Sequence, residues 1–181
     1  GAAAAATAAA DTDATRLEEA LRGAFADVAA QLSETGVAGG TTATAVLVDV
    51  RCALVAHVGD SHAALVSGST LTRLTTAHRL TNAAEADAVR ARGGTVEAAG
   101  RGEMRVNGLL ALTRALGDPE LRGAITAEPD VRHFAFDFER DSAIVIACDG
   151  LWDFVSFVAK HSLFTPHTTP QAARRARAGE G

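Results

Sequence analysis

Apolar residues recur at helical spacing early in the chain. Between Leu17 and Leu32 they follow the i, i+3, i+4, i+7 pattern of one buried helix face, which comprises Leu17, Ala20, Leu21, Ala24, Phe25, Val28, Ala29 and Leu32. Residues 12–15 offer side chains for an N-cap, and Gly36 suits a helix end. The pattern predicts a first helix that begins near residue 12, after an alanine-rich, low-complexity lead-in over residues 1–11.

After two consecutive glycines at 39–40, the pattern changes to short, valine-rich apolar runs separated by Gly, Asp or Arg. Such runs are typical of strands joined by tight turns. The first four runs predict an antiparallel meander over residues 43–50, 52–58, 62–66 and 71–74. Residues 134–138 alternate weakly, and the wholly apolar residues 143–148 predict a central strand.

Two more helices complete the order of elements. Asn82 to about Arg92 is predicted as a helix, with Glu85 placed as in a capping box. A third helix is expected from Gly150 to about His161, before a polar tail over residues 165–181 that contains proline and arginine. Runs of strands with segregated helices indicate the α+β class, in which layered antiparallel sheets pack against helices, and residues 12–164 would form that domain.

Composition narrows the classes of function. With 181 residues and 48% hydrophobic residues, the chain can form one domain or a large part of a bigger one. A net charge of −5 argues against nucleic acid as a direct partner. The longest apolar stretches fall short of the roughly 20 residues that span a bilayer, so no membrane partner is expected. Cys52 and Cys148 lie in apolar runs and are interpreted as buried thiols. Free thiols are typical of a reducing compartment, so an intracellular protein is expected, with the cytoplasm as the first expectation.

The first candidate for chemistry is a pair of acids after the last apolar run. Asp149 stands where the predicted strand ends and a helix begins, and Asp153 follows about one helical turn later. Hard cations such as Mg²⁺ and Mn²⁺ prefer oxygen ligands, which such a pair supplies. The alternative is that Asp149 is only an N-cap and Asp153 an acid favoured by the helix dipole. The local sequence by itself favours that alternative.

Two other segments are less specific when they are taken alone. The Gly59-Asp60-Ser61 segment is composed of ordinary turn residues and needs no function. The stretch 105–118 fits a hairpin plus a loop whose arginines pair with acids.

The motifs of several common enzyme classes are missing from the sequence. The six histidines show no zinc-site spacing. The chain also lacks GxSxG, GxxxxGKS and GxGxxG motifs, which argues against serine hydrolases, P-loop enzymes and Rossmann dehydrogenases.

Taken together, these pieces resemble the type-2C metal-dependent protein serine/threonine phosphatases over about residues 17–160. The resemblance rests on order and spacing, and its specific parts are the stretches 105–118 and 147–153. The supporting segments are Gly40-Thr41-Thr42-Ala43, Val58-Gly59-Asp60-Ser61, Leu74-Thr75 with His78, Glu85 with Gly93-Gly94, and Ala127-Glu128-Pro129-Asp130-Val131.

The resemblance implies two antiparallel sheets sandwiched between helices, with Mg²⁺ or Mn²⁺ ions at one edge. It implies that a metal-bound water attacks phosphoserine or phosphothreonine. Asp149 matches the metal-binding Asp at the end of a core strand. Asp60 and Asp153 match the acids that, together with Asp149, hold a third and weaker ion. The implied partner is a phosphoprotein substrate.

This sequence also departs from the family pattern. No Asp-Gly-His-Gly-Gly motif and no phosphate-binding arginine precede Leu17, and no Asp-Asn pair follows the third predicted helix. The main dinuclear site therefore lacks two of its acids. We expect an incomplete and inactive portion of a phosphatase domain, whose open sheet is covered by further chain or by a protein partner. The alternative is a catalytically dead pseudophosphatase that acts as a scaffold or binding subunit.

Overall fold

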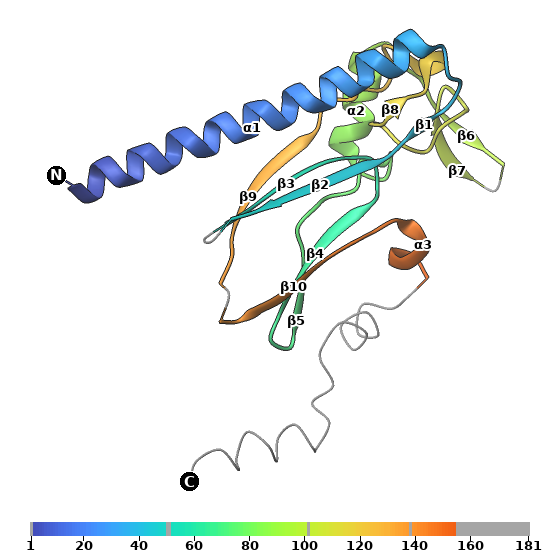
Figure 1. Cartoon of the computed structure of the whole chain (residues 1–181). Helices are drawn as coiled ribbons and strands as arrows, with labels where there is room; N and C mark the ends of the chain where they lie inside the picture. The colour runs from blue at the N-terminus through green and yellow to red at the C-terminus, as the bar shows by residue number, and fades with distance from the viewer. Residues whose placement is uncertain (1, 50–51, 101, 138, 155–181) are drawn as a thin grey trace.

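A computed structural model describes residues 2–49, 52–100, 102–137 and 139–154, with side chains described from residue 13. The helices are α1 (Ala2–Thr35), α2 (Ala83–Ala91), the 3₁₀ turn η1 (Pro119–Leu121) and α3 (Asp149–Trp152). The strands are β1 (Gly40–Thr41), β2 (Ala43–Val48), β3 (Cys52–Val58), β4 (His62–Ser67), β5 (Thr70–Arg73), β6 (Val96–Ala99), β7 (Glu103–Val106), β8 (Leu116–Gly117), β9 (Asp130–Ala135) and β10 (Asp141–Ala147). Figure 1 shows their arrangement.

Two three-stranded antiparallel sheets form the centre of the described part. One sheet has the order β2-β3-β9 and the other has the order β10-β4-β5. Because side chains alternate along a strand, Val55 of β3 and Ala63 of β4 enter the layer between the sheets, while their neighbours Ala56 and Ala64 face outward. The inner layer is completed by Leu74 with Val46, Leu65, Phe134 and Ile144. The predicted α+β class with stacked antiparallel sheets is confirmed.

Helix α1 lies across the outer face of the β2-β3-β9 sheet (Figure 1). It begins at Ala2, so the expected start near residue 12 is wrong. Alanine has the highest helix propensity, and the alanine-rich lead-in therefore extends the helix. Only part of the predicted buried helix face contacts the sheet, through Phe25 with Leu21, Ala29 and Leu32. Leu17 and Val28 are 49% and 43% exposed, because the contact with the sheet follows a narrower face.

The meander predicted for residues 43–74 is wrong at its centre. β2 pairs with β3 and β4 pairs with β5, but β3 and β4 lie in different sheets. The turn at residues 59–61 carries the chain from one sheet to the other. Gly59 has φ +90°, and a Cβ there would clash with Cγ2 of Thr42. Only glycine fits this crossing without displacing its neighbour.

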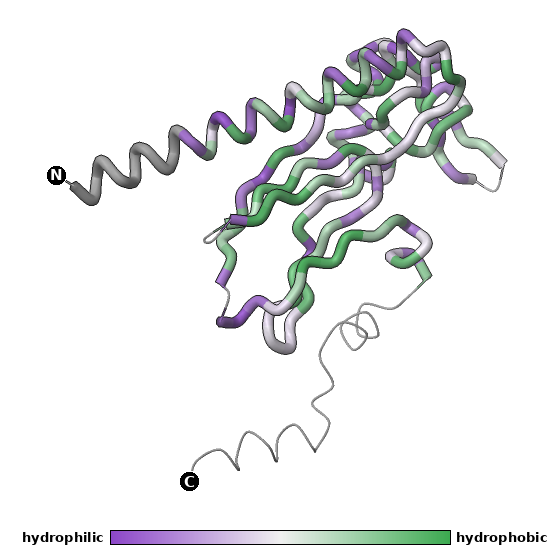
Figure 2. Tube along the Cα trace, viewed as in Figure 1, coloured by the Kyte–Doolittle hydropathy of each residue, from purple (hydrophilic) through white to green (hydrophobic). Residues whose placement is uncertain are grey.

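Residues 143–148 were expected to form a central strand, but β10 is an edge strand among the described residues, and so is β2. β10 lies at one edge of its sheet with β4 in the centre, and β2 lies at the edge of the other. Residues 143–147 of β10 are all apolar: Ile144 faces the other sheet, while Val145 packs in the cluster around Trp152. Leu47 and Ile146 remain 44% and 48% exposed. Figure 2 shows the apolar character of both strands.

The two later helices begin close to their predicted positions. The Asn82 side chain caps α2 by accepting a hydrogen bond from the amide of Ala84. Glu85 does not close a capping box, because its carboxylate is used by Thr113 and Arg114. α3 runs from Asp149 to Trp152. Its expected continuation to residue 161 and the tail at 165–181 lie outside the described residues.

No helix in the described part is long and apolar enough to cross a membrane. Cys52 is half-buried and Cys148 is exposed, so the prediction of two buried thiols is wrong for Cys148. Cys148 directly follows the edge strand β10 and immediately precedes α3, where no element of the described part covers it.

Candidate metal site

The three acids identified from the sequence line one open cavity of about 700 Å³. Asp60 comes from the turn between β3 and β4, Asp149 begins α3, and Asp153 follows α3. Arg79 and Cys148 line the same cavity. Three carboxylates from separate positions in the sequence are therefore brought to one end of the sandwich.

The fold holds Asp60 in place through the turn that precedes β4. The amide of Gly59 donates a hydrogen bond to Nδ1 of His78 at 3.1 Å, and the hydroxyls of Ser61 and Thr42 lie 2.7 Å apart. The Asp60 side chain is 12% exposed. Its Oδ2 accepts a hydrogen bond of 2.7 Å from Nε of Arg79.

Trp152 anchors the short helix that carries the other two acids. Its indole Nε1 donates to the carbonyl of Ala147 at 2.7 Å and to that of His62 at 3.1 Å. Its ring also packs edge-on against the His62 ring, with 6.3 Å between centroids. These contacts fix α3 against the β10-β4 pair, and thereby set the positions of Asp149 and Asp153.

Arg79 joins two of the three acids. Its Nη2 lies 2.7 Å from Oδ2 of Asp60 and 2.9 Å from Oδ2 of Asp153. The Asp149 side chain is exposed and has no hydrogen bond or ion pair within the described ranges. The three carboxylates line the same cavity, but their oxygens do not all lie within 4.8 Å of one another. Their all-oxygen donor set is the kind that a hard cation such as Mg²⁺ or Mn²⁺ prefers. The sequence-based assignment of the three acids as metal ligands remains a prediction.

A fourth acid, Asp118, lines the same cavity and is only 8% exposed. It adopts the left-handed conformation with φ 50°, which is uncommon for a residue other than glycine. A Cβ on Gly40 would meet the Asp118 carboxylate, so glycine at 40 allows this close approach. Burial, and secondarily the nearby Glu120, raises the pKa of the Asp118 carboxyl.

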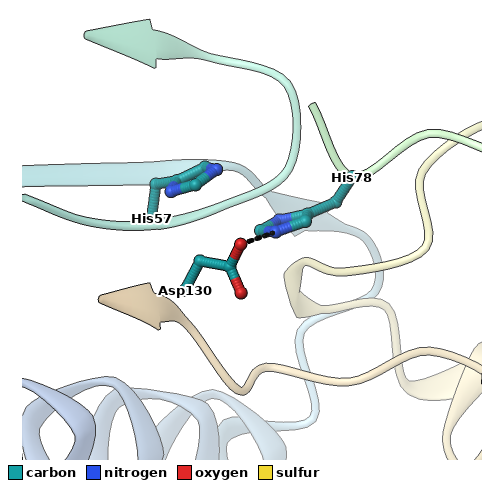
Figure 3. Close-up of side chains that lie close together, drawn as sticks. All are labelled: His57, His78 and Asp130. Atoms are coloured by element: carbon teal, nitrogen blue, oxygen red, sulfur yellow. Dashed lines mark ion pairs between the residues drawn. The ribbon is translucent and has the colours of Figure 1, made fainter. Parts of the chain in front are cut away.

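A second group of polar residues lies outside the lining of the cavity (Figure 3). The rings of His57 and His78 stack with 4.5 Å between centroids, and both side chains are buried. Nε2 of His78 lies 3.5 Å from Oδ2 of Asp130. The potential ligand atoms of these three residues all lie within 4.8 Å of one another. This arrangement is a candidate metal group that the spacing of the histidines in the sequence did not reveal.

The hydrogen bonds of this group favour a structural role. Because the Gly59 amide donates to Nδ1 of His78, the proton of the neutral imidazole belongs on Nε2, which points toward Asp130. Nε2 of His78 makes no hydrogen bond in the described part, but a metal ion would need its lone pair and could bind there only if the proton left. Nε2 of His57 donates to the carbonyl of Thr76 at 2.8 Å, which leaves only Nδ1 with a lone pair. Burial lowers the pKa of His57, and it lowers that of His78 to about 4, so both rings stay neutral.

An ion-pair network continues from Asp130 to α2. The Arg114 guanidinium contacts Glu85 at 2.5 Å and Asp130 at 3.1 Å. Burial alone would raise the pKa of Glu85, but hydrogen bonds from Arg114 and from the hydroxyl of Thr113 lower it overall. The network ties α2, the loop before β8 and the start of β9 together. The expected pairing of arginines with acids in the stretch 105–118 is present here.

Sequence reasoning did not single out Arg79. It sits one residue after His78 and would look like any solvent-exposed arginine in a polar turn. Its position beside a histidine that binds the Gly59-Asp60 turn is visible only once the two segments are folded together.

Three comparisons place this geometry among known proteins. The family model described as "Protein phosphatase 2C" matches residues 4–158. The chain belongs to the protein phosphatase 2C family. It is 37% identical over 120 residues to "Probable protein phosphatase 2C 9" of Arabidopsis thaliana, which corresponds to 66% of this chain and 42% of that protein.

Solved structures agree with that membership. A C. elegans sex-determining protein superposes with a TM-score of 0.72 at 31% identity, over 77% of this chain and 34% of that one. A serine-threonine phosphatase 2C from Toxoplasma gondii superposes with a TM-score of 0.71 over 90% of this chain and 56% of that one. At 20% identity this second likeness shows the fold alone. The chain spans about half the length, or less, of the protein phosphatase 2C relatives it matches.

Proposed function

We propose that this chain forms part of the catalytic domain of a metal-dependent phosphatase that acts on phosphoserine and phosphothreonine. Asp60, Asp149 and Asp153 would hold a Mg²⁺ or Mn²⁺ ion at the open cavity. Such an ion supplies charge neutralisation for a phosphate and lowers the pKa of bound water. The observation that carries the proposal is the convergence of these three carboxylates, from separate positions in the sequence, on one cavity.

The residues of the chain have distinct roles in this proposal. Trp152 holds α3 so that Asp149 and Asp153 face the cavity, and the 59–61 turn does the same for Asp60. Ser61 and Thr42 supply hydroxyls on the cavity wall. Asp149 is the acid whose side chain is free of ion pairs in the described part, so it is the first ligand available to a cation.

We further propose that the chain as given does not hydrolyse phosphate esters by itself. The family's first metal motif and its closing Asp-Asn pair have no counterparts in the 181 residues. With three acids and no further ligands, water would fill most of the coordination sphere, which favours weak binding of about millimolar affinity. A scaffold role as a pseudophosphatase is the alternative outcome.

Calorimetric titration with MnCl₂ tests the metal site. We expect one weak site, of about millimolar affinity, that is lost when Asp60, Asp149 and Asp153 are all replaced by Asn. The matched control replaces Asp13, Asp27 and Asp87, three exposed acids outside the cavity, by Asn and leaves binding unchanged. Equal binding by the cavity variant and the wild-type chain would contradict the assignment.

Hydrolysis is tested separately with p-nitrophenyl phosphate and a phosphothreonine peptide in millimolar Mn²⁺. We expect no rate above background for this chain. A metal-dependent rate that disappears in Asp149→Asn would show that other residues complete the site. If a longer natural chain that contains these residues also binds Mn²⁺ without hydrolysis, the scaffold alternative is favoured.

A further inference from the structure

The position of Arg79 points to a role that the three acids alone do not reveal. Its guanidinium reaches into the cavity and binds Asp60 through Nε at 2.7 Å. Its Nη2 binds Asp153 at 2.9 Å. Asp60 and Asp153 stand far apart in the sequence, in the β3–β4 turn and after α3, and Arg79 connects them directly.

We infer that Arg79 is an internal counter-ion that competes with the divalent cation for Asp60 and Asp153. This inference rests on the metal site of the proposed function. The Oδ2 atom of each acid is used by the guanidinium, so a cation that takes either atom must displace a charge-assisted hydrogen bond. Asp149 has no such partner in the described part and stays available.

The burial of the participants indicates how strong the competition is. The Asp60 side chain is 12% exposed, and its ion pair with Arg79 is therefore only partly screened by water. Asp153 is 49% exposed, so its contact with Arg79 contributes less. Displacement of Arg79 from Asp60 is thus the costly step in metal binding, and release from Asp153 costs little.

The backbone of Arg79 is fixed by hydrogen bonds, which keeps its side chain directed into the cavity. Its backbone forms an isolated antiparallel bridge with Leu112, and its carbonyl accepts a hydrogen bond from the Asn82 amide at 3.0 Å. The neighbouring His78 binds the Gly59 amide. With the backbone fixed on both sides, loading of the cation requires a rotation of the Arg79 side chain alone.

The competition predicts that removal of the guanidinium strengthens metal binding. We expect Arg79→Gln to bind Mn²⁺ about tenfold more tightly than the wild-type chain, which corresponds to about 1.4 kcal/mol. Arg79→Lys keeps the charge but cannot contact both acids in the same way, so an intermediate affinity is expected. Arg105→Gln is the matched control, because Arg105 lines the same cavity but pairs with Glu103 instead of the three acids.

The test combines calorimetry with a direct view of the side chain. Mn²⁺ titrations compare the wild-type chain, Arg79→Gln, Arg79→Lys and Arg105→Gln. In parallel, Mg²⁺ is titrated into ¹⁵N-labelled wild-type chain while the Nε–H resonance of Arg79 is followed by NMR. We expect this resonance to be protected in the free chain and to lose protection as the ion binds.

The outcomes separate this inference from the proposed function. Suppose that the wild-type chain binds Mn²⁺, that Arg79→Gln binds it no more tightly than Arg105→Gln, and that the Nε–H resonance does not respond to Mg²⁺. The inference that Arg79 competes with the cation is then wrong, but the proposed metal site is still supported. If binding survives the replacement of Asp60, Asp149 and Asp153, the metal site itself is wrong and the competition fails with it.

Discussion

Removal of Arg114 is expected to destabilise the chain through its ion-pair network with Glu85 and Asp130. Its guanidinium contacts Glu85 at 2.5 Å and Asp130 at 3.1 Å, and it also donates to the carbonyl of Glu128 at 3.1 Å. The Glu85 side chain is 9% exposed and that of Arg114 is 20% exposed. Arg114→Met keeps much of the apolar stem but leaves Glu85 as a buried charge with only the hydroxyl of Thr113 as a partner.

Loss of one partner from a buried pair costs about 3–5 kcal/mol, because the remaining charge stays desolvated. Arg114 is partly exposed, which places the expected loss for Arg114→Met at about 3 kcal/mol. Glu85→Gln removes the charge but keeps the shape and leaves Asp130 for Arg114, so we expect about 1–3 kcal/mol. The double variant should cost less than the sum of the two, with a coupling energy of about 1 kcal/mol or more.

Urea denaturation followed by circular dichroism gives these free energies of unfolding. Arg90→Met is the matched control, because Arg90 pairs with Asp87 on the exposed side of α2 at 55% and 75% exposure. Such surface pairs contribute at most about 1 kcal/mol. A loss for Arg114→Met no larger than that for Arg90→Met, or strict additivity in the double variant, would mean that Glu85 and Arg114 do not form a stabilising buried pair.

Three other outcomes are expected. Burial lowers the pKa of His62 and His78 to about 4, from about 6.5 in the unfolded chain. The free energy of unfolding should therefore be greatest above pH 6.5 and fall toward pH 4, by up to about 3 kcal/mol per histidine. A flat pH profile of the free energy of unfolding would contradict this. Gly59→Ala should cost at least about 2 kcal/mol, through φ +90° and the clash with Thr42. Gly68→Ala is the control in the same urea assay: Gly68 also has a positive φ, of +54°, but open space around it, so this variant lacks the clash and should cost clearly less. The exposed apolar residues of β2 and β10 should make the chain bind a hydrophobic dye, and dye binding no greater than that of a fully folded control protein would contradict this.

Local patterns predicted the elements well, but they did not predict how the elements are arranged. Alternation and apolar runs located most of β2, β3, β4 and β10 to within a few residues, because side-chain periodicity is a local property. The sheet change at Gly59 could not be read from the pattern, since a tight turn between strands looks the same whether or not the strands pair. The apolar run of β10 likewise indicates burial on both faces, but it does not indicate whether the strand lies at the centre or at the edge of its sheet.

The candidate site was predicted in part for a similar reason. Asp149 and Asp153 were visible because they are close together at the start of one helix, and the family resemblance added Asp60. The partner Arg79 and the group of His57, His78 and Asp130 are brought together by folding across long separations in the sequence. Spacing rules for metal and catalytic motifs do not detect such contacts.

Crystals soaked in MnCl₂ give the position of the ion from anomalous scattering and that of the Arg79 side chain from the electron density, so one experiment tests both the metal site and the competition. We expect a manganese peak among the carboxylates of Asp60, Asp149 and Asp153, with the Arg79 guanidinium turned away from Asp60. A peak between His57, His78 and Asp130, or a cavity that stays empty of manganese while Arg79 still bridges Asp60 and Asp153, would contradict it.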